Sequence, residues 1–174
     1  MNKKSPAPFP TEGMSEAYEK LLKLSMKEFK LLKAKTGPAL HKLIDKSSET
    51  LSELEEVSKE EAEKISGYLK RDLKEAAAYM AETGEDFQKW LAIDTNIIEN
   101  YLYEQFKQAA DQTTVELAQL KAAAENAQYH TGEIIGPGVL VCDVCGENLH
   151  FHKAGHIPPC AKCQGTYFHR LFCR

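Results

Sequence analysis

The chain has 174 residues, enough for one domain of ordinary size or for one domain and a small module. Charged residues make up 28% and hydrophobic residues 43%, which is typical of a soluble protein with a long helical part. The formal net charge of −4 argues against a general attraction to nucleic acid or to anionic membranes.

The N-terminal stretch MNKKSPAPFP has lysines but no apolar core after them, so it does not have the pattern of a secretory signal. No apolar run approaches the roughly 18 to 20 residues that span a bilayer. We therefore expect a cytoplasmic protein, in which paired cysteines hold metal more often than they form lasting disulfides. Residues 1–12 contain three prolines and are predicted to be a flexible N-terminus.

The composition changes near residue 130. Residues 13–130 are rich in Ala, Glu, Lys, Leu and Gln, whereas residues 131–174 hold all five cysteines together with Gly, Pro, His and β-branched residues. We predict a helical bundle or hairpin over 13–130 and a small β module over 131–174.

The first predicted helix covers residues 15–34, before a break at Gly37 and Pro38, because glycine ends helices and proline starts them. Apolar residues then recur at helical spacing through 39–82, which forms either one bent helix or two.

Ser58 followed by Glu61 is a capping box at the start of a helix. We therefore favour a break at 57–58, and hence two helices rather than one bent helix.

Thr83, Gly84, Glu85 and Asp86 form the clearest turn of the helical half, because glycine ends one helix and acids suit the start of the next. No residue from 87 to about 127 breaks a helix, so we expect one continuous helix of about 60 Å. Its apolar stripe must pack on the earlier helices or on another chain. The predicted fold is mainly α, an elongated antiparallel hairpin or bundle with Gly84 at one tip. The heptads are too imperfect to define a strict coiled coil.

Two Cys-x-x-Cys pairs lie in VCDVCGENLHFHKAGHIPPCAKC (141–163), separated by fourteen residues. Two turns of this kind bring four thiolates into the tetrahedral arrangement that Zn²⁺ prefers. Short strand-like flanks suggest a zinc ribbon, which metal must stabilise because some forty residues hold too little core. The predicted zinc ligands are Cys142, Cys145, Cys160 and Cys163.

Glycine follows the first pair directly, at Gly146, where the chain must turn back. Gln164 takes that place after the second pair and Gly165 comes one residue later, so we expect a slightly strained second turn.

Zinc is favoured over three alternatives. An iron site could use the same four thiolates, and the cysteines could form disulfides. A thioredoxin-like redox centre needs a βαβ unit, for which the sequence shows no pattern. Because four cysteines fill the coordination sphere of zinc, the site is expected to be structural, with no position for an activated water.

The histidines of residues 131–174 and the fifth cysteine are expected to lie outside the metal site. A Cys₃His site would leave one paired cysteine idle, so no histidine ligand is expected. His150 and His152 alternate as residues on the solvent face of a strand do. His156 is expected in a loop before Pro158 and Pro159. The role of His169 stays open, and Cys173 is expected to be a free thiol.

The segments YHTGEIIGPGVLVCDVCG (129–146) and IPPCAKCQGTYFHR (157–170) resemble the YbeL-type bacterial zinc-ribbon proteins, a family of unknown function. SKEEAEKISGYLKRDLKEA (58–76) resembles the charged helix of the same family. The resemblance implies a C-terminal zinc ribbon after a helical region, with the four paired cysteines as ligands. The chain departs from it at Ala161 and Gln164, where proline and glycine are usual.

A non-enzymatic interaction or adaptor protein is the function we favour from the sequence, with an unknown protein partner. The helical half has no Gly-rich phosphate loop, no H-E-x-x-H and no G-x-S-x-G. His130, Thr131 and Glu133 are expected to mark the exit from the long helix rather than a catalytic site. The long helix could also pair in a homodimer, although closure within one chain is simpler.

Nucleic-acid binding is an alternative. Residues 131–174 have four basic and three acidic side chains, and four thiolates with one Zn²⁺ bring the segment to about −1. Phe151, Tyr167 and Phe168 could stack on bases but are expected to build the small core of the ribbon.

An RNA-polymerase-associated regulator is a further alternative, because a helical hairpin with an acidic tip beside a zinc module is the plan of factors that enter the polymerase channel. Glu85 and Asp86 would be the tip acids, but acids in a first helical turn also simply complement the helix dipole.

Overall fold

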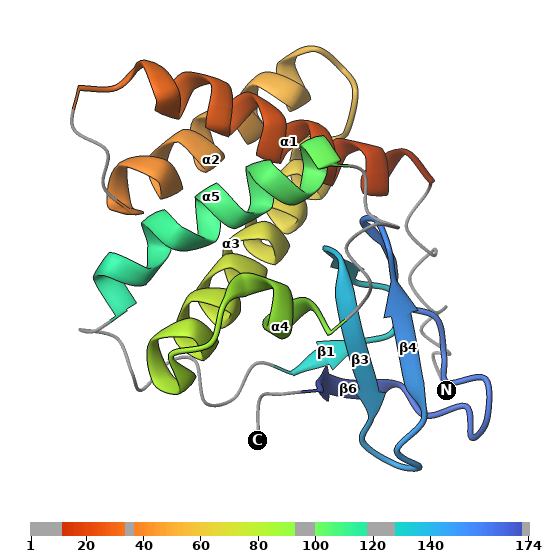
Figure 1. The fold of residues 1–174 in the computed structure, drawn as a ribbon. Helices are drawn as coiled ribbons and strands as arrows, with labels where there is room; N and C mark the ends of the chain where they lie inside the picture. Colours follow the sequence, from red (N-terminus) through yellow and green to blue (C-terminus); the bar gives the residue numbers. More distant parts are fainter. Residues whose placement is uncertain (1–11, 34–36, 93–99, 118–127, 172–174) are drawn as a thin grey trace.

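The computed structural model describes residues 12–33, 37–92, 100–117 and 128–171 (Figure 1). The helices are α1 (Glu12–Leu31), α2 (Gly37–Glu53), α3 (Lys59–Thr83), α4 (Phe87–Leu91) and α5 (Asn100–Leu117). The strands are β1 (Tyr129–His130), β2 (Ile134–Ile135), β3 (Gly138–Cys142), β4 (Asn148–Phe151), β5 (Gly155–His156) and β6 (Tyr167–Arg170). The fold is thus mainly α with a small C-terminal antiparallel sheet, and no helix in these ranges is long and apolar enough to cross a membrane.

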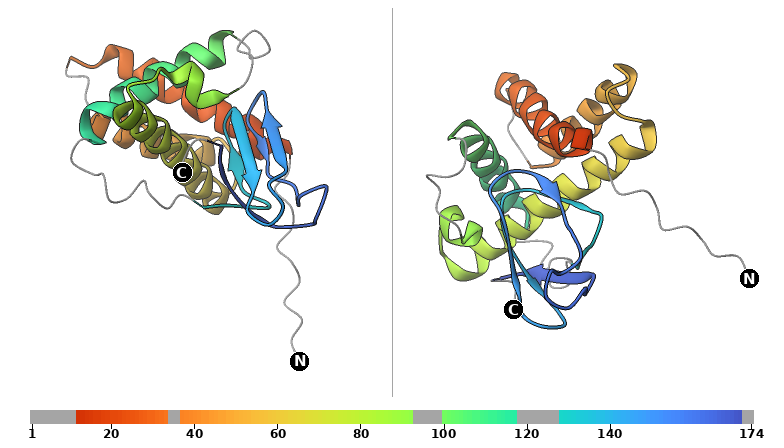
Figure 2. Two further views of the ribbon diagram at one scale, coloured as in Figure 1. Left: turned by 60° about the horizontal axis from the view of Figure 1, so that its bottom comes forward. Right: turned by 90° about the vertical axis from the view of Figure 1, so that its right-hand side faces the viewer.

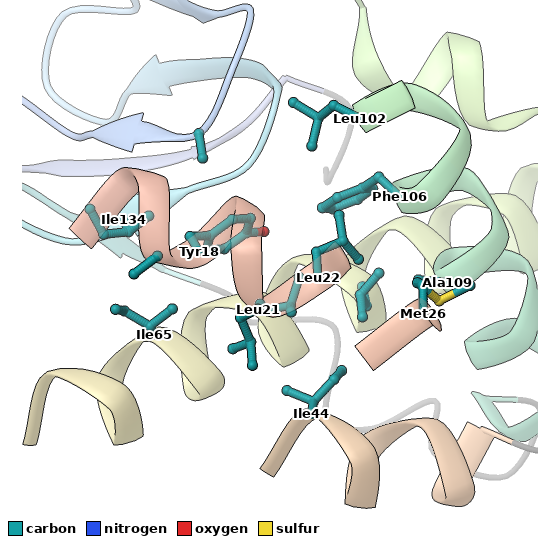
Figure 3. Close-up of a cluster of buried hydrophobic side chains, with 14 of the residues drawn as sticks. Tyr18, Leu21, Leu22, Met26, Ile44, Ile65, Leu102, Phe106, Ala109 and Ile134 are labelled. Carbon is teal, nitrogen blue, oxygen red and sulfur yellow. The ribbon is translucent and has the colours of Figure 1, made fainter. Parts of the chain in front are cut away.

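Helices α1, α2, α3 and α5 pack around one core, and the sheet lies at one end of this group (Figures 1 and 2). Buried residues recur along α1 at steps of three and four, as an amphipathic helix requires. Figure 3 shows Tyr18, Leu21 and Leu22 of α1 facing Ile44 of α2 and Phe106 of α5. Each fully buried side chain of this kind contributes roughly 1.5–3 kcal/mol of transfer free energy.

The predicted break between two central helices is confirmed. The Ser58 hydroxyl accepts from the backbone N–H of Glu61 at 3.2 Å, and Glu61 Oε2 accepts from the Ser58 N–H at 2.8 Å. Gly84 ends α3 as predicted, with a positive φ of 68° and a hydrogen bond from its N–H to the Met80 carbonyl. Both ends of α3 are therefore set by local sequence.

The single long helix expected from residue 87 onward is wrong. Helix α4 ends at Leu91, because Ala92 adopts a positive φ of 58° and donates to the Lys89 carbonyl. Trp90 explains the break, since it is buried beside the sheet and its ring stacks on Phe106 at 5.8 Å. Tertiary packing thus overrides helix propensity at this position. The part of the predicted helix beyond residue 117 lies outside the described residues.

The C-terminal part forms a four-stranded antiparallel sheet in the order β1-β6-β3-β4 and a two-stranded sheet of β2 and β5. In the central pair, Cys142 of β3 lies opposite Phe168 of β6, and Leu140 lies opposite Arg170. Strand β1 pairs Tyr129 with Phe168, so the sheet begins at residue 129. This pairing places the first cysteine of the motif at the end of a central strand.

Strand β2 joins the helical core to the ribbon. Ile134 and Ile135 are both fully buried. Ile134 belongs to the helical core (Figure 3), whereas Ile135 belongs to a separate ribbon core. Successive residues of a strand point to opposite faces, so two neighbouring residues can serve both cores. Helix α1 and helix α3 both contact β2.

A buried carboxylate on α3, Asp72, is satisfied mainly by residues from other elements. Its Oδ2 accepts 2.7 Å hydrogen bonds from the Tyr18 hydroxyl and from the backbone N–H of Gly136. Its Oδ1 accepts from Arg71 at 3.3 Å and from the Tyr129 hydroxyl at 3.4 Å. Burial, followed by the charge of Asp72, raises the pKa of Tyr18 well above its ordinary value, so Tyr18 stays a donor.

Arg170 completes this junction from the ribbon side. Its Nη1 donates to the Pro137 carbonyl at 2.8 Å, and its guanidinium lies 4.2 Å from the Trp90 ring centroid. Its Nε lies 3.6 Å from Glu75 Oε2, and its Nη2 lies 3.8 Å from Asp72 Oδ1. Because a buried charge is costly unless paired, these contacts hold the ribbon in one position on the helices.

Candidate metal centre

The structure brings the four cysteines predicted as ligands into one cluster. Their sulfur atoms all lie within 4.8 Å of one another. The Sγ atoms of Cys142 and Cys163 are 3.5 Å apart, and so are those of Cys145 and Cys160. Each close pair thus joins one cysteine of the first motif to one of the second.

The two Cys-x-x-Cys turns have the same backbone hydrogen bonds. In the first, the Cys142 N–H donates to the Glu147 carbonyl and the Gly146 N–H donates to the Cys142 carbonyl. In the second, the Cys160 N–H donates to the Gly165 carbonyl and the Gln164 N–H donates to the Cys160 carbonyl. The matching contacts, at spacings of five and four residues, make the two halves of the site local copies of each other.

The predicted strain of the second turn is confirmed. Gly146 has a φ of 73°, and Gln164 at the equivalent place has a φ of 59°, a region that side chains disfavour. Gly165 is needed for a different reason. A Cβ there would lie 3.0 Å from the Cys142 sulfur and 3.2 Å from the Cys163 sulfur.

Backbone hydrogen bonding tunes the thiols. The backbone of Cys163 donates to Cys160 and is the main cause that lowers the pKa of the Cys160 thiol to about 7. The N–H of Gly165, 3.4 Å from Cys163 Sγ, acts in the same direction on Cys163. The Cys145 thiol and burial outweigh it and raise the pKa of Cys163 to about 12. Four thiolates this close need a cation between them.

The residues fit a zinc ion. A Zn–S distance of about 2.3 Å in tetrahedral geometry places sulfurs about 3.8 Å apart, close to the observed pairs. A disulfide would need about 2.05 Å, so these four cysteines are free thiols here. Bound at the centre, the ion would link β3 to the segment before β6. Four sulfurs would complete its coordination.

The histidines of the module lie outside the cluster, which contains no histidine among the described residues. His150 is exposed on β4, as expected, whereas His152 is exposed but lies just after the end of β4. His169 Nδ1 contacts Asp143 Oδ1. The loop expected around His156 is wrong, because His156 lies in β5 and pairs with Ile134 of β2. Cys173 lies outside the described residues.

The aromatic residues of the ribbon divide between core and surface. Phe168 is fully buried in the ribbon core, and Phe151 packs against that core from a half-buried position. Tyr167 differs from the expectation, since it is 49% exposed and its ring meets His130 edge-on at 4.5 Å.

The expected helix exit at His130, Thr131 and Glu133 is wrong, because these residues form strand β1 and the turn after it. Glu133 Oε2 lies 2.5 Å from Arg71 Nη1, and the Thr131 hydroxyl donates to the Pro158 carbonyl at 3.3 Å. All three therefore have contacts that hold the ribbon together or hold it on α3.

The junction residues Asp72, Glu75 and Arg170 were not found from the sequence. Asp72 follows Leu69 by three residues and Ile65 by seven, which places it on the buried face of α3. The sequence signal that could have identified Asp72 is a charged residue at a position that helical periodicity turns toward the core.

The acids at the start of α4 have structural partners. The Asp86 carboxylate caps the helix by accepting from the Lys89 N–H at 3.0 Å. Glu85 Oε2 lies 2.5 Å from Lys89 Nζ. Both contacts match the helix-start interpretation of these residues.

Comparisons with known proteins agree with this site. The uncharacterized protein YbeL of Escherichia coli K12 is 26% identical over 133 residues, which are 74% of this chain and 79% of YbeL. The YbeL proteins of strains O6:H1 and O157:H7 match equally. No solved structure matches. Residues 27–171, which include both cysteine pairs and most of the helical part, match the DUF1451 family, described as zinc-ribbon containing domain, and the chain belongs to this family.

Proposed function

We propose that the protein is a non-enzymatic, zinc-binding interaction protein of the cytoplasm, in which a structural zinc ribbon and a helical part together bind a protein partner. The observation that carries this proposal is the convergence of four cysteine sulfurs within 4.8 Å, which fits a closed zinc site. A closed site stabilises a fold and has no position for substrate or activated water.

The fixed position of the ribbon supports the same role. Asp72 and Arg170 link the two parts through buried contacts, so both parts offer one continuous surface. A ribbon held rigidly against helices lowers the entropic cost of binding a partner across both, because little ordering remains to be done.

An enzyme is less well supported. His130, Thr131 and Glu133, the residues weighed for catalysis, are engaged in strand pairing and in contacts with Tyr167, Pro158 and Arg71. Nucleic-acid binding and a polymerase-associated role have weaker support as well. The ribbon segment is near neutral in charge, and Asp86 and Glu85 are used in starting α4.

The test compares partners of the metal-loaded protein with those of two variants in the native cell. Cys160→Ser removes one zinc ligand, and Tyr167→Ala changes an exposed ribbon residue without touching the metal. We expect the wild type to recover a partner protein in stoichiometric amount. Tyr167→Ala should still recover this partner, in equal or reduced amount. Cys160→Ser, at matched abundance, should not recover it. Recovery of nucleic acid with no protein, or a partner unaffected by Cys160→Ser, contradicts the proposal.

A further inference from the structure

A groove of about 740 Å³ lies between α1 and the first turns of α5, and none of the four cysteines lines it. Its volume is in the range of ligand and peptide sites. The metal centre and the buried junction do not account for this groove, so it is a separate feature of the helical part.

One rim of the groove is cationic. Lys20, Lys23, Lys27 and Lys30 all line it. Their steps of three, four and three residues place them on one face of α1 over about 15 Å. Lys20 contacts Glu56, whereas among the described residues no carboxylate pairs with Lys23, Lys27 or Lys30. Three ammonium groups in a row, none paired with a carboxylate of the described segments, contrast with the net charge of −4 of the chain.

The acidic lining residues lie toward the other end of the groove. Glu16 and Glu19 come from the earlier turns of α1. Glu19 is engaged with the ribbon, because its Oε1 accepts from the Ala154 N–H at 3.0 Å. The groove therefore has a charge gradient along α1, with the basic end beyond Lys20.

The basic part of the groove also exposes apolar side chains. Leu31 is 80% exposed and Tyr101 is 47% exposed, and both line the groove with Leu24 and Leu102. The Lys23 ammonium lies 5.0 Å from the Tyr101 ring centroid, so the charged and apolar surfaces are in contact. Large exposed apolar side chains gathered in a concave site are typical of a binding surface.

We propose that this groove binds the partner protein through an acidic amphipathic helix, whose apolar face covers Leu31 and Tyr101 while its carboxylates meet Lys23, Lys27 and Lys30. The lysine row is as long as about ten residues of a helix, or nearly three turns. This mode, an amphipathic helix laid in a hydrophobic groove, is a common form of peptide recognition.

The positive charge of the lysine row distinguishes an acidic helix from other possible occupants of the groove. In a symmetric pair of copies the same patch faces itself, so the lysine rows of two copies would repel each other. Phosphates of nucleic acid would satisfy the lysines but leave Leu31 and Tyr101 without apolar partners. An acidic helix matches both surfaces. The proposal rests on the interaction role proposed above and specifies the kind of partner segment that would bind, an acidic amphipathic helix.

The test uses the full, zinc-loaded chain and a labelled synthetic 18-residue helix with leucines on one face and glutamates beside them. Fluorescence anisotropy at low salt should show saturable binding. The triple variant Lys23→Glu, Lys27→Glu, Lys30→Glu should weaken it by about tenfold or more, because attraction becomes repulsion. The variant Leu31→Ser should weaken it by about threefold or more, since the apolar contact is lost.

The matched control is Lys42→Glu, Lys59→Glu, Lys74→Glu, which changes net charge equally at exposed lysines outside the groove and should alter affinity by less than about twofold. All variants change exposed residues, and an unchanged Tm shows that they fold.

Equal weakening by both triple variants overturns the proposal, and so does equal binding of a peptide with serines in place of the leucines. Preferential binding to phosphatidylglycerol vesicles, or groove-dependent dimerisation in light scattering, also overturns it. If the groove variants leave a zinc-dependent native complex intact, the groove proposal fails while the interaction role stands.

Discussion

The backbone N–H of Gly136, in the ribbon, donates a 2.7 Å hydrogen bond to Oδ2 of Asp72, a fully buried carboxylate on α3. The Tyr18 hydroxyl donates to the same oxygen at the same distance. One carboxylate thus ties α1, α3 and the loop before β3 together. The stability of the helical part should therefore depend on the ribbon that the metal orders.

Replacing Asp72 tests this dependence. Asp72→Asn keeps the shape but removes the charge that balances the nearby guanidinium groups of Arg71 and Arg170. We expect the free energy of unfolding to fall by about 2–4 kcal/mol in urea titrations followed by far-UV circular dichroism. The control is Asp45→Asn, whose carboxylate is 56% exposed and should cost less than about 1 kcal/mol. Equal losses for the two variants contradict the special role of Asp72.

Gly136 tests the close approach of the ribbon to the helices. A Cβ at this position would lie 2.7 Å from the Tyr18 hydroxyl oxygen and 2.9 Å from Phe106 Cε2. Gly136→Ala should therefore lower the free energy of unfolding by about 1–3 kcal/mol.

Two further variants identify the cause of that loss. Gly67 lies on an exposed face of α3 with nothing within 4 Å of an added Cβ, so Gly67→Ala should stabilise by up to about 1 kcal/mol. Tyr18→Phe removes the atom that clashes, so Gly136→Ala should cost less in that background than in the wild type. If the two costs are the same, the clash with Tyr18 is not the cause.

Gln164 stores strain beside the metal ligands. Its φ of 59° is easy for glycine and unfavourable for glutamine. At a fixed free zinc concentration, Gln164→Gly should raise the Tm of the metal-loaded protein by about 2–4 °C, which corresponds to about 1 kcal/mol. The reciprocal change Gly146→Gln should lower the Tm, because the φ at that position is 73°. A Tm that falls for Gln164→Gly, or rises for Gly146→Gln, in differential scanning calorimetry is inconsistent with a strained second turn.

His41 on α2 predicts a pH dependence that is separate from the metal. Burial, together with the charges of Lys74 and Lys70, lowers its pKa from 6.5 to about 4. Because the folded state favours the neutral imidazole, this contribution to stability is present above about pH 6.5 and is lost as the pH falls toward 4. After allowance for solvent screening, the loss is about 1–2 kcal/mol.

The variant His41→Gln should lose less stability than the wild type between pH 7 and pH 5 in urea titrations of metal-loaded protein. Any release of zinc at low pH affects both proteins, so the difference between them isolates His41. Parallel losses for the two proteins show that His41 does not titrate with a lowered pKa.

Sequence reasoning succeeded where the signal is local. The turn of each Cys-x-x-Cys pair, the cap at Ser58, the turn at Gly84 and the strained position of Gln164 all depend on residues within a few positions. The same reasoning failed at Ala92, because the helix ends there when Trp90 packs against Phe106 and Arg170. Those partners lie 16 and 80 residues further along the chain than Trp90, so they leave no local signal at Ala92.

The buried junction was missed for a related reason. Asp72 finds its partners 54 residues earlier, at Tyr18, and 64 residues later, at Gly136. Periodicity places a residue on a face of a helix but does not say which element covers that face. The position of the ribbon on the helices therefore had to come from the structure.

Metal content is the most direct test of the claim that the four sulfurs hold one zinc ion and thereby order the ribbon. We expect protein purified without added metal to contain one zinc per chain by inductively coupled plasma mass spectrometry, and Cys160→Ser to contain far less. Chelation should expose the segment from β1 to β6 to protease, and zinc should restore its protection. Wild-type protein that carries no stoichiometric zinc, and whose ribbon keeps its protection after chelation, contradicts the account.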